Sequence, residues 1–566
     1  MNKKYDVTFI NAPNHAEFPH FPIGIGYLNE ILKKNNISTN LIDIQNMIVN
    51  KEIRYEANIL NDIENILKNI KSKIFIFSIM NSTYIWAIEI IKIIKKYNLS
   101  SKIVVGGSHA TLLKEKLLEH NEIDVVCIYE GEKIITKLTN ALIKNDKNLL
   151  REIKNIYYRD DDNKIVFNGE EKLIVDLDRL PIIYYSTSEY KNRTSISLDV
   201  GRGCPHNCTF CVTKSIWKRF PRYKSPKRIV EESSIYYDMI PNGKRKMVLY
   251  EHDNFIFNKN ILSEVAYLKK KLKKNYYFGC SGELNDINDE VIELLDNAGC
   301  KYIFIGIETG SKRMQKIINK NLDLRNCLEK ISKLNEKNIV VEVNFIIGYP
   351  EEYITDLIES YYLMTSIKFS SPKLNNINFS MLSPEPTSKV EENLKEEYYL
   401  YDKKSIYHKD LNNSLIDINK YKKKFTNHLY IIRNENYDVE KIRDFSQIFI
   451  DMLNNFSITL YILMCKINIK IDDMVSYYLK VKKDNLSILE FLMQYTHLIK
   501  NYELFEEIFR YEELIYRFKN NMKFKNDIEY FNYDIKNIYR KLKENPKNLE
   551  DKFIIVKKPF KIKVDR

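Results

Sequence analysis

Three cysteines lie close together in the run GRGCPHNCTFCVTK, which covers residues 201–214. Cys204, Cys208 and Cys211 follow the pattern CxxxCxxC. A structural zinc site needs four Cys or His ligands, and His206, between the first two cysteines on a tight loop, is poorly placed to be the fourth. An iron–sulfur cluster can instead leave one iron open to a substrate or cofactor. The spacing therefore favours a cluster held by three thiolates over zinc.

The other cysteines are scattered, at positions 127, 280, 300, 327 and 465, and form no even disulfide framework. Widely spaced thiols of this kind are typical of buried free cysteines in a reducing compartment. The opening run MNKKYDVTFINAP contains no apolar stretch long enough for a signal peptide or a membrane span. We therefore expect a cytoplasmic protein that is not inserted in a membrane.

The chain is basic overall, with 89 Lys and Arg residues against 76 Asp and Glu residues and a net charge of +13. These charges are interspersed with Asn, Ile and Tyr, and no groove of alternating aromatic and basic residues stands out. The composition gives no strong signal for nucleic-acid binding. It indicates at most a modest preference for an acidic substrate or partner.

Residues 1–140 alternate short strand-like runs with helical periods, which predicts a doubly wound parallel sheet of the Rossmann type. We expect strands at 6–11, 38–43, 73–79, 102–107 and 125–131. Ligands bind such sheets at the carboxyl ends of the strands. Polar and glycine turns follow the strands there, at NAP (11–13), SIMNST (78–83), GGSHAT (106–111) and YEGE (129–132).

Residues 141–193 are predicted to be a connector with a hairpin at NIYYRDDDNKIVFN. From 194 to 390, six strand–helix units predict a partial (β/α)6 barrel, whose chemistry gathers at the carboxyl ends of its strands. The cysteines follow the first strand, His252 and Asp253 the second, Glu308 the fourth and Gly348 the fifth. Residues 391–566 hold no glycine and, between 387 and 545, no proline, which predicts a mainly helical domain.

The run CPHNCTFC, with its Gly-Arg-Gly lead-in, resembles the radical S-adenosylmethionine (SAM) enzymes. The stretches PRYKSPKRIVEE, NDEVIELLDNAGCKYIFIGIETGS, FIIGYPEE and SPEPTS are similar to successive barrel landmarks of the cobalamin-associated branch of this family. The resemblance implies a [4Fe-4S] cluster on the three cysteines, with SAM on the open iron as the source of a hydrogen-abstracting radical. It implies SAM contacts at Phe210, Asp253, Gly306, Glu308, Gly348 and Pro350, and it implies that the turn with Gly348 and Pro350 lies against the adenine of SAM.

The sequence leaves the roles of Glu308 and His252 open. Glu308 could accept hydrogen bonds from a ribose or amino group, or be a loop glutamate paired with a nearby Lys or Arg. His252 stands where the family more often has a first aspartate before Asp253. It could be a proton donor, a substrate contact or a neutral substitute, and it is the one weak candidate for a catalytic residue.

The turns NAP, GIGYL, GGSHAT and YEGE resemble the cobalamin-binding domain of the same subgroup. The resemblance implies cobalamin contacts at Asn11, Pro13, Ser78, Gly106, Gly107, His109, Glu130, Gly131 and Glu132. The cobalt-ligating DxHxxG motif of many cobalamin domains is absent. Either cobalamin is held without a protein histidine, which we favour, or the domain is only a scaffold, and His109 is then a loop or corrin-edge contact. Methylthiotransferases carry three cysteines in this domain, whereas this chain has only Cys127.

The resemblance implies an enzyme, most simply a methyltransferase acting at an unactivated carbon of a peptide or natural product. It also implies an external electron donor such as flavodoxin or ferredoxin. The alternatives are a cobalamin-associated cyclase or rearrangement enzyme on the same fold, and a non-catalytic binding protein. Clustered, oxidation-prone thiols argue against the non-catalytic alternative.

Overall fold

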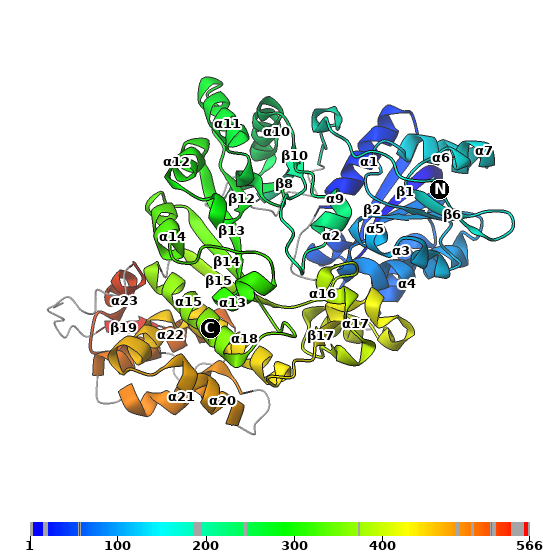
Figure 1. The fold of residues 1–566 in the computed structure, drawn as a ribbon. Coiled ribbons are helices and arrows are strands. Elements are labelled where there is room, and N and C mark those ends of the chain that lie inside the picture. Colours follow the sequence, from blue (N-terminus) through cyan, green and yellow to red (C-terminus); the bar gives the residue numbers. More distant parts are fainter. Residues whose placement is uncertain are drawn as a thin grey trace. The chain divides into compact units, whose positions relative to one another are not determined.

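The computed structural model describes residues 4–14, 21–54, 56, 58–185, 195–241, 246–371, 374–480, 486–499, 503–520, 522, 528–544 and 560–563. The chain divides into two compact units (Figure 1). The first comprises Met1–Ser281 and Ser383–Ile432, and the second comprises Gly282–Leu382 and Arg433–Arg566. Both units contain parallel strands connected by helices, as the alternating pattern predicted.

The N-terminal sheet of the first unit has seven strands in the order β2-β1-β3-β4-β5-β6-β7. They are β1 (Lys4–Asn11), β2 (Thr39–Asp43), β3 (Lys71–Ser78), β4 (Lys102–Gly106), β5 (Val125–Cys127), β6 (Ile156–Arg159) and β7 (Ile165–Phe167). Strands β1 to β5 are parallel, which confirms the predicted doubly wound sheet. The hairpin predicted in the connector forms as β6 and β7 and extends this sheet with antiparallel strands.

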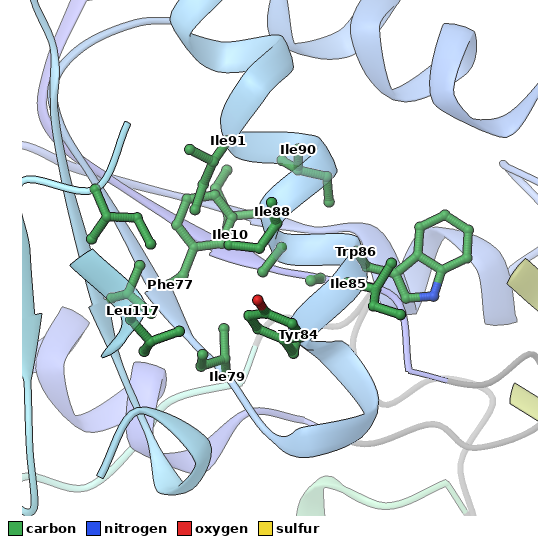
Figure 2. Close-up of a cluster of buried hydrophobic side chains, with 14 of the residues drawn as sticks. Ile10, Phe77, Ile79, Tyr84, Ile85, Trp86, Ile88, Ile90, Ile91 and Leu117 are labelled. Carbon is green, nitrogen blue, oxygen red and sulfur yellow. The ribbon is translucent and has the colours of Figure 1, made fainter. Parts of the chain in front are cut away.

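Helices cover both faces of this sheet, because alternate strand residues point to opposite sides. The helices are α1 (Ile23–Lys34), α2 (Ile44–Val49), α3 (Ile59–Leu67), α4 (Tyr84–Tyr97), α5 (Ser108–Leu113), α6 (Ile135–Lys144) and α7 (Lys147–Arg151). On one face, Phe9 belongs to the cluster that includes residues of α1 and α6. On the other, Ile10 and Phe77 pack with Ile88 and Ile91 of α4 (Figure 2). The two apolar faces hold the strand ends of the sheet in place.

Three strands of the predicted barrel belong to the first unit: β8 (Ser195–Asp199), β11 (Met247–Glu251) and β12 (Phe278–Gly282). Strand β11 pairs in parallel with both of the others. The connecting helices are α9 (Thr213–Trp217), α10 (Pro226–Met239) and α11 (Lys259–Lys271). A short antiparallel pair, β9 (Gly201–Arg202) with β10 (Arg222–Tyr223), lies between β8 and α10.

Residues 383–432 also fold with the first unit. They contain α16 (Lys389–Glu392), α17 (Ile406–Asn413) and the antiparallel strands β16 (Tyr399–Tyr401) and β17 (Tyr430–Ile432). Tyr421 and Phe425 of this segment pack edge-on against the ring of Tyr84, at the start of α4. The boundary that we expect near 391 remains a prediction from sequence.

The second unit contains the remaining three parallel strands, β13 (Cys300–Glu308), β14 (Val340–Ile347) and β15 (Asn375–Met381). Their helices are α12 (Asp289–Ala298), α13 (Lys312–Ile317), α14 (Cys327–Glu336) and α15 (Ile354–Ser370). The six parallel strands expected of the partial barrel are thus present in the chain, three in each unit.

The chain after residue 433 is mainly helical, which confirms the predicted character of the C-terminal region. Its helices are α18 (Val439–Asn455), α19 (Ser457–Tyr461), α20 (Ile471–Lys480), α21 (Ile488–Ile499), α22 (Glu503–Lys519) and α23 (Ile535–Glu544), and its short strands are β18 (Ile528–Phe531) and β19 (Phe560–Lys563). Within the described residues, no one helix has the length and apolar composition to cross a bilayer. The pair Val439–Asn455 and Ser457–Lys466 meets both criteria only when joined across a bend of 103°.

Candidate functional site

The cysteine loop begins directly after β9, and two glycines shape its start. A Cβ at Gly201 would lie 2.3 Å from the carbonyl oxygen of Arg222. Gly203 has φ +95°, and a Cβ there would lie 2.5 Å from the carbonyl oxygen of Phe220. Only glycine fits such close backbone approaches. The Gly-Arg-Gly lead-in is therefore required by the packing of this loop.

The three cysteines and Phe210 lie partly exposed on this loop, and none of the eight cysteines forms a disulfide. The amide of Cys211 donates to the carbonyl oxygen of Cys208 at 3.2 Å. The Thr213 amide donates to the sulfur of Cys211 at 3.5 Å. Three thiols on one loop are a donor set that suits a cluster with three protein ligands. Across the described ranges, no group of three or more His, Cys, Asp or Glu is arranged to hold a single metal ion.

Asp253 connects the end of β11 to the cysteine loop. Its carboxylate accepts hydrogen bonds from the amide of Gly203 at 2.8 Å and from the hydroxyl of Thr213 at 3.3 Å. Burial raises the pKa of Asp253, against these hydrogen bonds. The predicted SAM contact therefore also fixes the position of the loop.

His252 is buried beside Asp253. Its ring stacks on Tyr223 with 4.3 Å between the ring centroids, and its Nδ1 accepts the amide of Asn254 at 2.9 Å. Burial lowers the pKa of His252 to about 4, so that the ring is neutral at pH 7. A proton-donor role for His252 remains a prediction, and the neutral ring is poorly suited to it at neutral pH.

A cavity of about 500 Å³ lies between the carboxyl ends of the two sets of strands in the first unit. From the N-terminal sheet it is lined by the predicted cobalamin contacts Ser78, Gly106, Gly107, Glu130, Gly131 and Glu132. From the barrel strands it is lined by Asp199, Gly201, Arg202, Glu251, His252 and Asp253. Six of the nine predicted cobalamin contacts therefore line the same cavity as His252 and Asp253, two of the residues that sequence analysis selected in the barrel.

A buried group of charges closes one side of this cavity. Arg202 makes ion pairs with Glu130 at 2.8 Å, with Glu132 at 2.6 Å and with Asp199 at 3.1 Å. Arg222 shares Glu130, also at 2.8 Å. All five side chains are at most 9% exposed. We call these five residues the ion cluster. It ties the YEGE loop to the strand that leads into the cysteine loop.

Sequence analysis missed Arg202 and Arg222 as site residues. Arg202 lay inside the quoted Gly-Arg-Gly lead-in, but its partners Glu130 and Glu132 are about 70 residues away in the chain, so no local pattern reveals the pairing. The two carboxylates, which we predicted as cobalamin contacts, are held by arginines and line the cavity with their remaining surface.

The other three predicted cobalamin contacts lie elsewhere in the first unit. Asn11 donates to Asp43 at 2.7 Å, and Pro13 is buried in the following loop. His109 is 1% exposed, and its Nε2 lies 3.0 Å from the carbonyl oxygen of Phe425. None of these three lines the cavity. Their assignment remains a prediction from the resemblance.

The burial of His109 predicts an acid-sensitive fold. Burial lowers its pKa to about 4, below the ordinary value of 6.5. Between these values the unfolded chain binds more protons, so stability falls as the pH drops. We expect the protonation of His109 in the unfolded chain to lower the free energy of unfolding by about 2 kcal/mol at pH 5. Denaturant unfolding at pH 7.5 and pH 5 measures it, and His109→Gln, which keeps a donor for Phe425, should lose correspondingly less stability on acidification. An equal loss in both proteins would contradict this role.

The remaining predicted SAM contacts lie in the second unit. Glu308 ends β13 with φ +68°, is 7% exposed and makes an ion pair with Lys320 at 3.0 Å. The Glu308 side chain folds back over Gly306, where a Cβ would lie 2.1 Å from its Oε1. The lysine pairing that we kept as an alternative is therefore present, and a SAM contact of Glu308 remains a prediction. Gly348 and Pro350 lie in the turn after β14, where Gly348 has φ +92°.

Two stretches of the chain match known domain families. Residues 198–363 match the radical SAM superfamily, and residues 14–139 match the B12 binding domain. The chain is 24% identical over 377 residues to an uncharacterized methyltransferase of Pyrococcus horikoshii, which covers 65% of this chain and 77% of that protein. It is 25% identical over 325 residues to the anaerobic magnesium-protoporphyrin IX monomethyl ester cyclase of Rubrivivax gelatinosus, which covers 55% of this chain and 56% of the cyclase.

A solved structure shares the fold. The cobalamin-dependent SAM radical enzyme OxsB with aqua-cobalamin bound aligns with a TM-score of 0.60 and 17% identity, over 91% of this chain and 73% of OxsB. The matched domains define an iron–sulfur enzyme that uses SAM and a corrinoid. The chain therefore carries both a radical SAM domain and a B12-binding domain. Its cofactors are a [4Fe-4S] cluster, SAM and cobalamin, and such enzymes act on small-molecule or peptide substrates and need a reductant.

The cavity fits a large cofactor at one position in particular. A Cβ at Gly24, in the first turn of α1, would meet no atom within 4 Å. Gly24 lines the cavity together with Leu28 and Leu138, so that open space lies against backbone and an apolar wall. A corrin, with its flat apolar faces, suits such a cradle.

Proposed function

We propose that the protein transfers a methyl group from SAM to an unactivated carbon of a small-molecule or peptide substrate. The observation that supports this proposal is the cavity of the first unit, which strand ends of the B12-binding domain and of the radical SAM domain line together. When bound, the cofactors supply a hydrogen-abstracting radical at the cluster and a transferable methyl group at the corrin. The protein's contribution is to keep the two cofactor loops facing one space.

Residues of this chain have separate roles in that arrangement. Cys204, Cys208 and Cys211 hold the cluster, and Asp253 fixes their loop through Gly203. The ion cluster fixes the YEGE loop against the lead-in to the cysteine loop. Because these charges are paired and buried, they hold the two loops in a defined geometry. We propose SAM contacts at Phe210 and Asp253 of the first unit. Within the second unit, we separately propose SAM contacts at Gly306, Glu308, Gly348 and Pro350.

We also propose that the protein works in the cytoplasm with flavodoxin or ferredoxin as the reductant. The support is the set of three oxidation-prone cysteines, which a reducing compartment preserves. A protein with a net charge of +13 also attracts acidic electron carriers.

The products formed from SAM test the proposed reaction. Methyl transfer consumes SAM in two ways, giving S-adenosylhomocysteine from the methyl donor and 5′-deoxyadenosine from the radical source. We expect the reconstituted protein with bound cobalamin and a chemical reductant to form both nucleosides, measured by liquid chromatography. Formation of 5′-deoxyadenosine without S-adenosylhomocysteine would instead support the cyclase or rearrangement alternative. Formation of neither would overturn the enzymatic proposal.

Gly24 allows a direct test of the cobalamin site. Gly24→Leu fills the cradle from within a helix, where leucine is favoured over glycine by about 0.5–1 kcal/mol. We therefore expect the variant to lose cobalamin while its melting temperature stays equal or rises. Corrin absorption after gel filtration measures retention. Gly24 and Lys34 are both exposed positions of α1, but Lys34 does not line the cavity. Lys34→Leu is therefore the control and should retain the cofactor. Full retention by Gly24→Leu would contradict cobalamin binding at this wall.

A further inference from the structure

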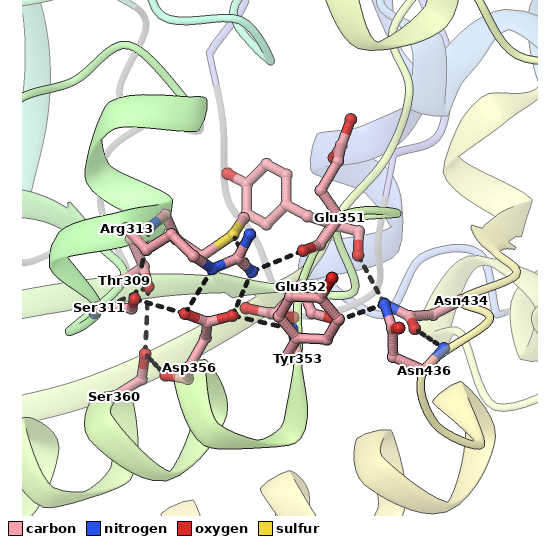
Figure 3. A network of polar contacts seen from close by, with 12 residues as sticks. Thr309, Ser311, Arg313, Glu351, Glu352, Tyr353, Asp356, Ser360, Asn434 and Asn436 are labelled. Atoms are coloured by element: carbon pink, nitrogen blue, oxygen red, sulfur yellow. Dashed lines mark hydrogen bonds and ion pairs between the residues drawn. The ribbon is translucent and has the colours of Figure 1, made fainter.

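The turn after β14 is held by a segment that follows the barrel. Asn434 donates through Nδ2 to the carbonyl oxygens of Tyr349 at 2.7 Å and Glu352 at 3.0 Å. Asn436 donates to the same oxygen of Glu352 at 3.1 Å (Figure 3). Asn434 is 6% exposed, and its own Oδ1 accepts the amide of Asn436 at 2.6 Å. Side chains of the segment 434–437 thus donate hydrogen bonds to two backbone carbonyl oxygens of the turn.

The side chain of Glu352 closes the turn from inside. It is fully buried, and its Oε2 accepts the amide of Gly348 at 2.9 Å and the hydroxyl of Tyr437 at 2.7 Å. Burial raises the pKa of Glu352 to about 7, and nearby Asp356 acts in the same direction. Hydrogen bonds from Tyr437 and from the amides of Gly348 and Tyr349 act in the opposite direction. Gly348 has φ +92°, and the hydrogen bond to Glu352 fixes the glycine in this conformation. Tyr437 therefore acts on Gly348 through one intervening carboxylate.

The same network reaches the turn after β13. Arg313 donates to the carbonyl oxygen of Glu351 at 2.6 Å and forms an ion pair with Asp356. The hydroxyl of Ser311 donates to Asp356 at 2.5 Å (Figure 3). The amide of Gly310 donates to Ser360 at 2.9 Å. The first turns of α15 thus join the turn that follows Glu308 to the turn that contains Gly348 and Pro350. The predicted SAM contacts of the second unit lie at the end of β13, directly before the first of these turns, and within the second turn.

We propose that Tyr437 and Asn434 are positioning residues for SAM, which shape the turn 348–352 against the nucleoside half of the cofactor. This inference rests on the proposed function, because it takes Gly348 and Pro350 as SAM contacts. It also assigns a role to the chain after the barrel, since the segment that enters α18 completes the nucleoside side of the SAM site. Neither residue needs to touch SAM, because both act through the backbone of the turn and through Glu352.

Binding of SAM and of free methionine distinguishes this role from a general loss of structure. Methionine carries the amino and carboxylate groups of SAM but lacks the nucleoside. The experiment measures the affinity of both ligands for the anaerobically reconstituted full-length protein, by calorimetry and by the change in the cluster's spectrum. Tyr437→Phe removes only the donor to Glu352. We expect it to weaken SAM binding about 3- to 10-fold, the value of one ordinary hydrogen bond, and to leave methionine binding unchanged.

Two further variants complete the experiment. Asn434→Asp keeps the size of the side chain and its acceptor but loses the two donors, and we expect the same selective weakening. Tyr362→Phe is the matched control, because the hydroxyl of Tyr362 also donates to a carboxylate, that of Asp472 at 3.0 Å, on an exposed part of the second unit. This control should bind both ligands like the wild type.

The outcomes separate the inference from the proposed function. Wild-type affinity for SAM in both Tyr437→Phe and Asn434→Asp would overturn the inference and leave the proposed function intact. Equal weakening of SAM and methionine would also overturn it, because the effect would then not be confined to the nucleoside. Failure of the wild-type protein to bind SAM at all would overturn the proposed function and the inference with it.

Discussion

Cys208→Ala is expected to abolish the cleavage of SAM to 5′-deoxyadenosine. In the proposed site the cluster has three cysteine ligands, Cys204, Cys208 and Cys211. The central one shares a turn with Cys211, because the Cys211 amide donates to its carbonyl oxygen at 3.2 Å. Two remaining thiolates cannot hold four irons with one iron open to SAM. We expect 5′-deoxyadenosine formation at background level and a strong loss of iron and sulfide, measured after anaerobic reconstitution.

Cys465→Ala is the control for this experiment, since Cys465 is an exposed cysteine outside the motif. It should reconstitute and cleave SAM like the wild type. The assignment of the cluster ligands fails if Cys208→Ala keeps full activity, or if Cys465→Ala loses it to the same extent. Because the alanine variant removes a side chain from a partly exposed loop, we expect its melting temperature without the cluster to be close to that of the wild type.

The sequence predicts well those features that short stretches of chain determine. Runs such as KIFIFSI and KIVVGG are rich in β-branched residues and are bounded by polar turns, and they form β3 and β4 of the parallel sheet. The compact cysteine motif indicates its chemistry without any tertiary contact. The glycine turns at 106–107 and 131 reach the cavity because parallel strands place their carboxyl ends at one edge.

Features that depend on distant residues could not be predicted in this way. The pairing of Arg202 with Glu130 and Glu132 joins two domains, and charged residues in a loop normally indicate solvent exposure. Pairing of Glu308 with a nearby basic residue was one of two alternatives from the sequence, but the choice between them depends on a left-handed residue whose side chain folds back over Gly306. The packing of Tyr421 and Phe425 on α4 crosses more than 300 residues of chain. Such contacts are determined by the folded structure and not by a local pattern.

Arg202→Met is expected to destabilise the protein by about 3–5 kcal/mol, the usual cost of removing one partner from a buried ion pair. Methionine fills a similar volume but leaves Glu130, Glu132 and Asp199 with Arg222 as the one remaining cation of the ion cluster. Burial opposes the charge on Arg202, but the three carboxylates, Glu132 first, raise its pKa well above the ordinary value. The expected loss is measured by denaturant unfolding at pH 7.5, compared with the wild type.

Two other variants show whether this loss comes from uncompensated buried charge. Adding Glu132→Gln to Arg202→Met removes one of the carboxylates that lost its partner. The double variant should therefore be more stable than Arg202→Met, even though it carries one more substitution. Arg179→Met breaks the exposed ion pair with Asp176, where Arg179 is 83% exposed, and should change stability by less than about 1 kcal/mol. If Arg202→Met is as stable as Arg179→Met, the ion cluster does not hold the YEGE loop. If the double variant is instead less stable than Arg202→Met, the loss reflects packing around the arginine, because stranded charge would be relieved by the second change.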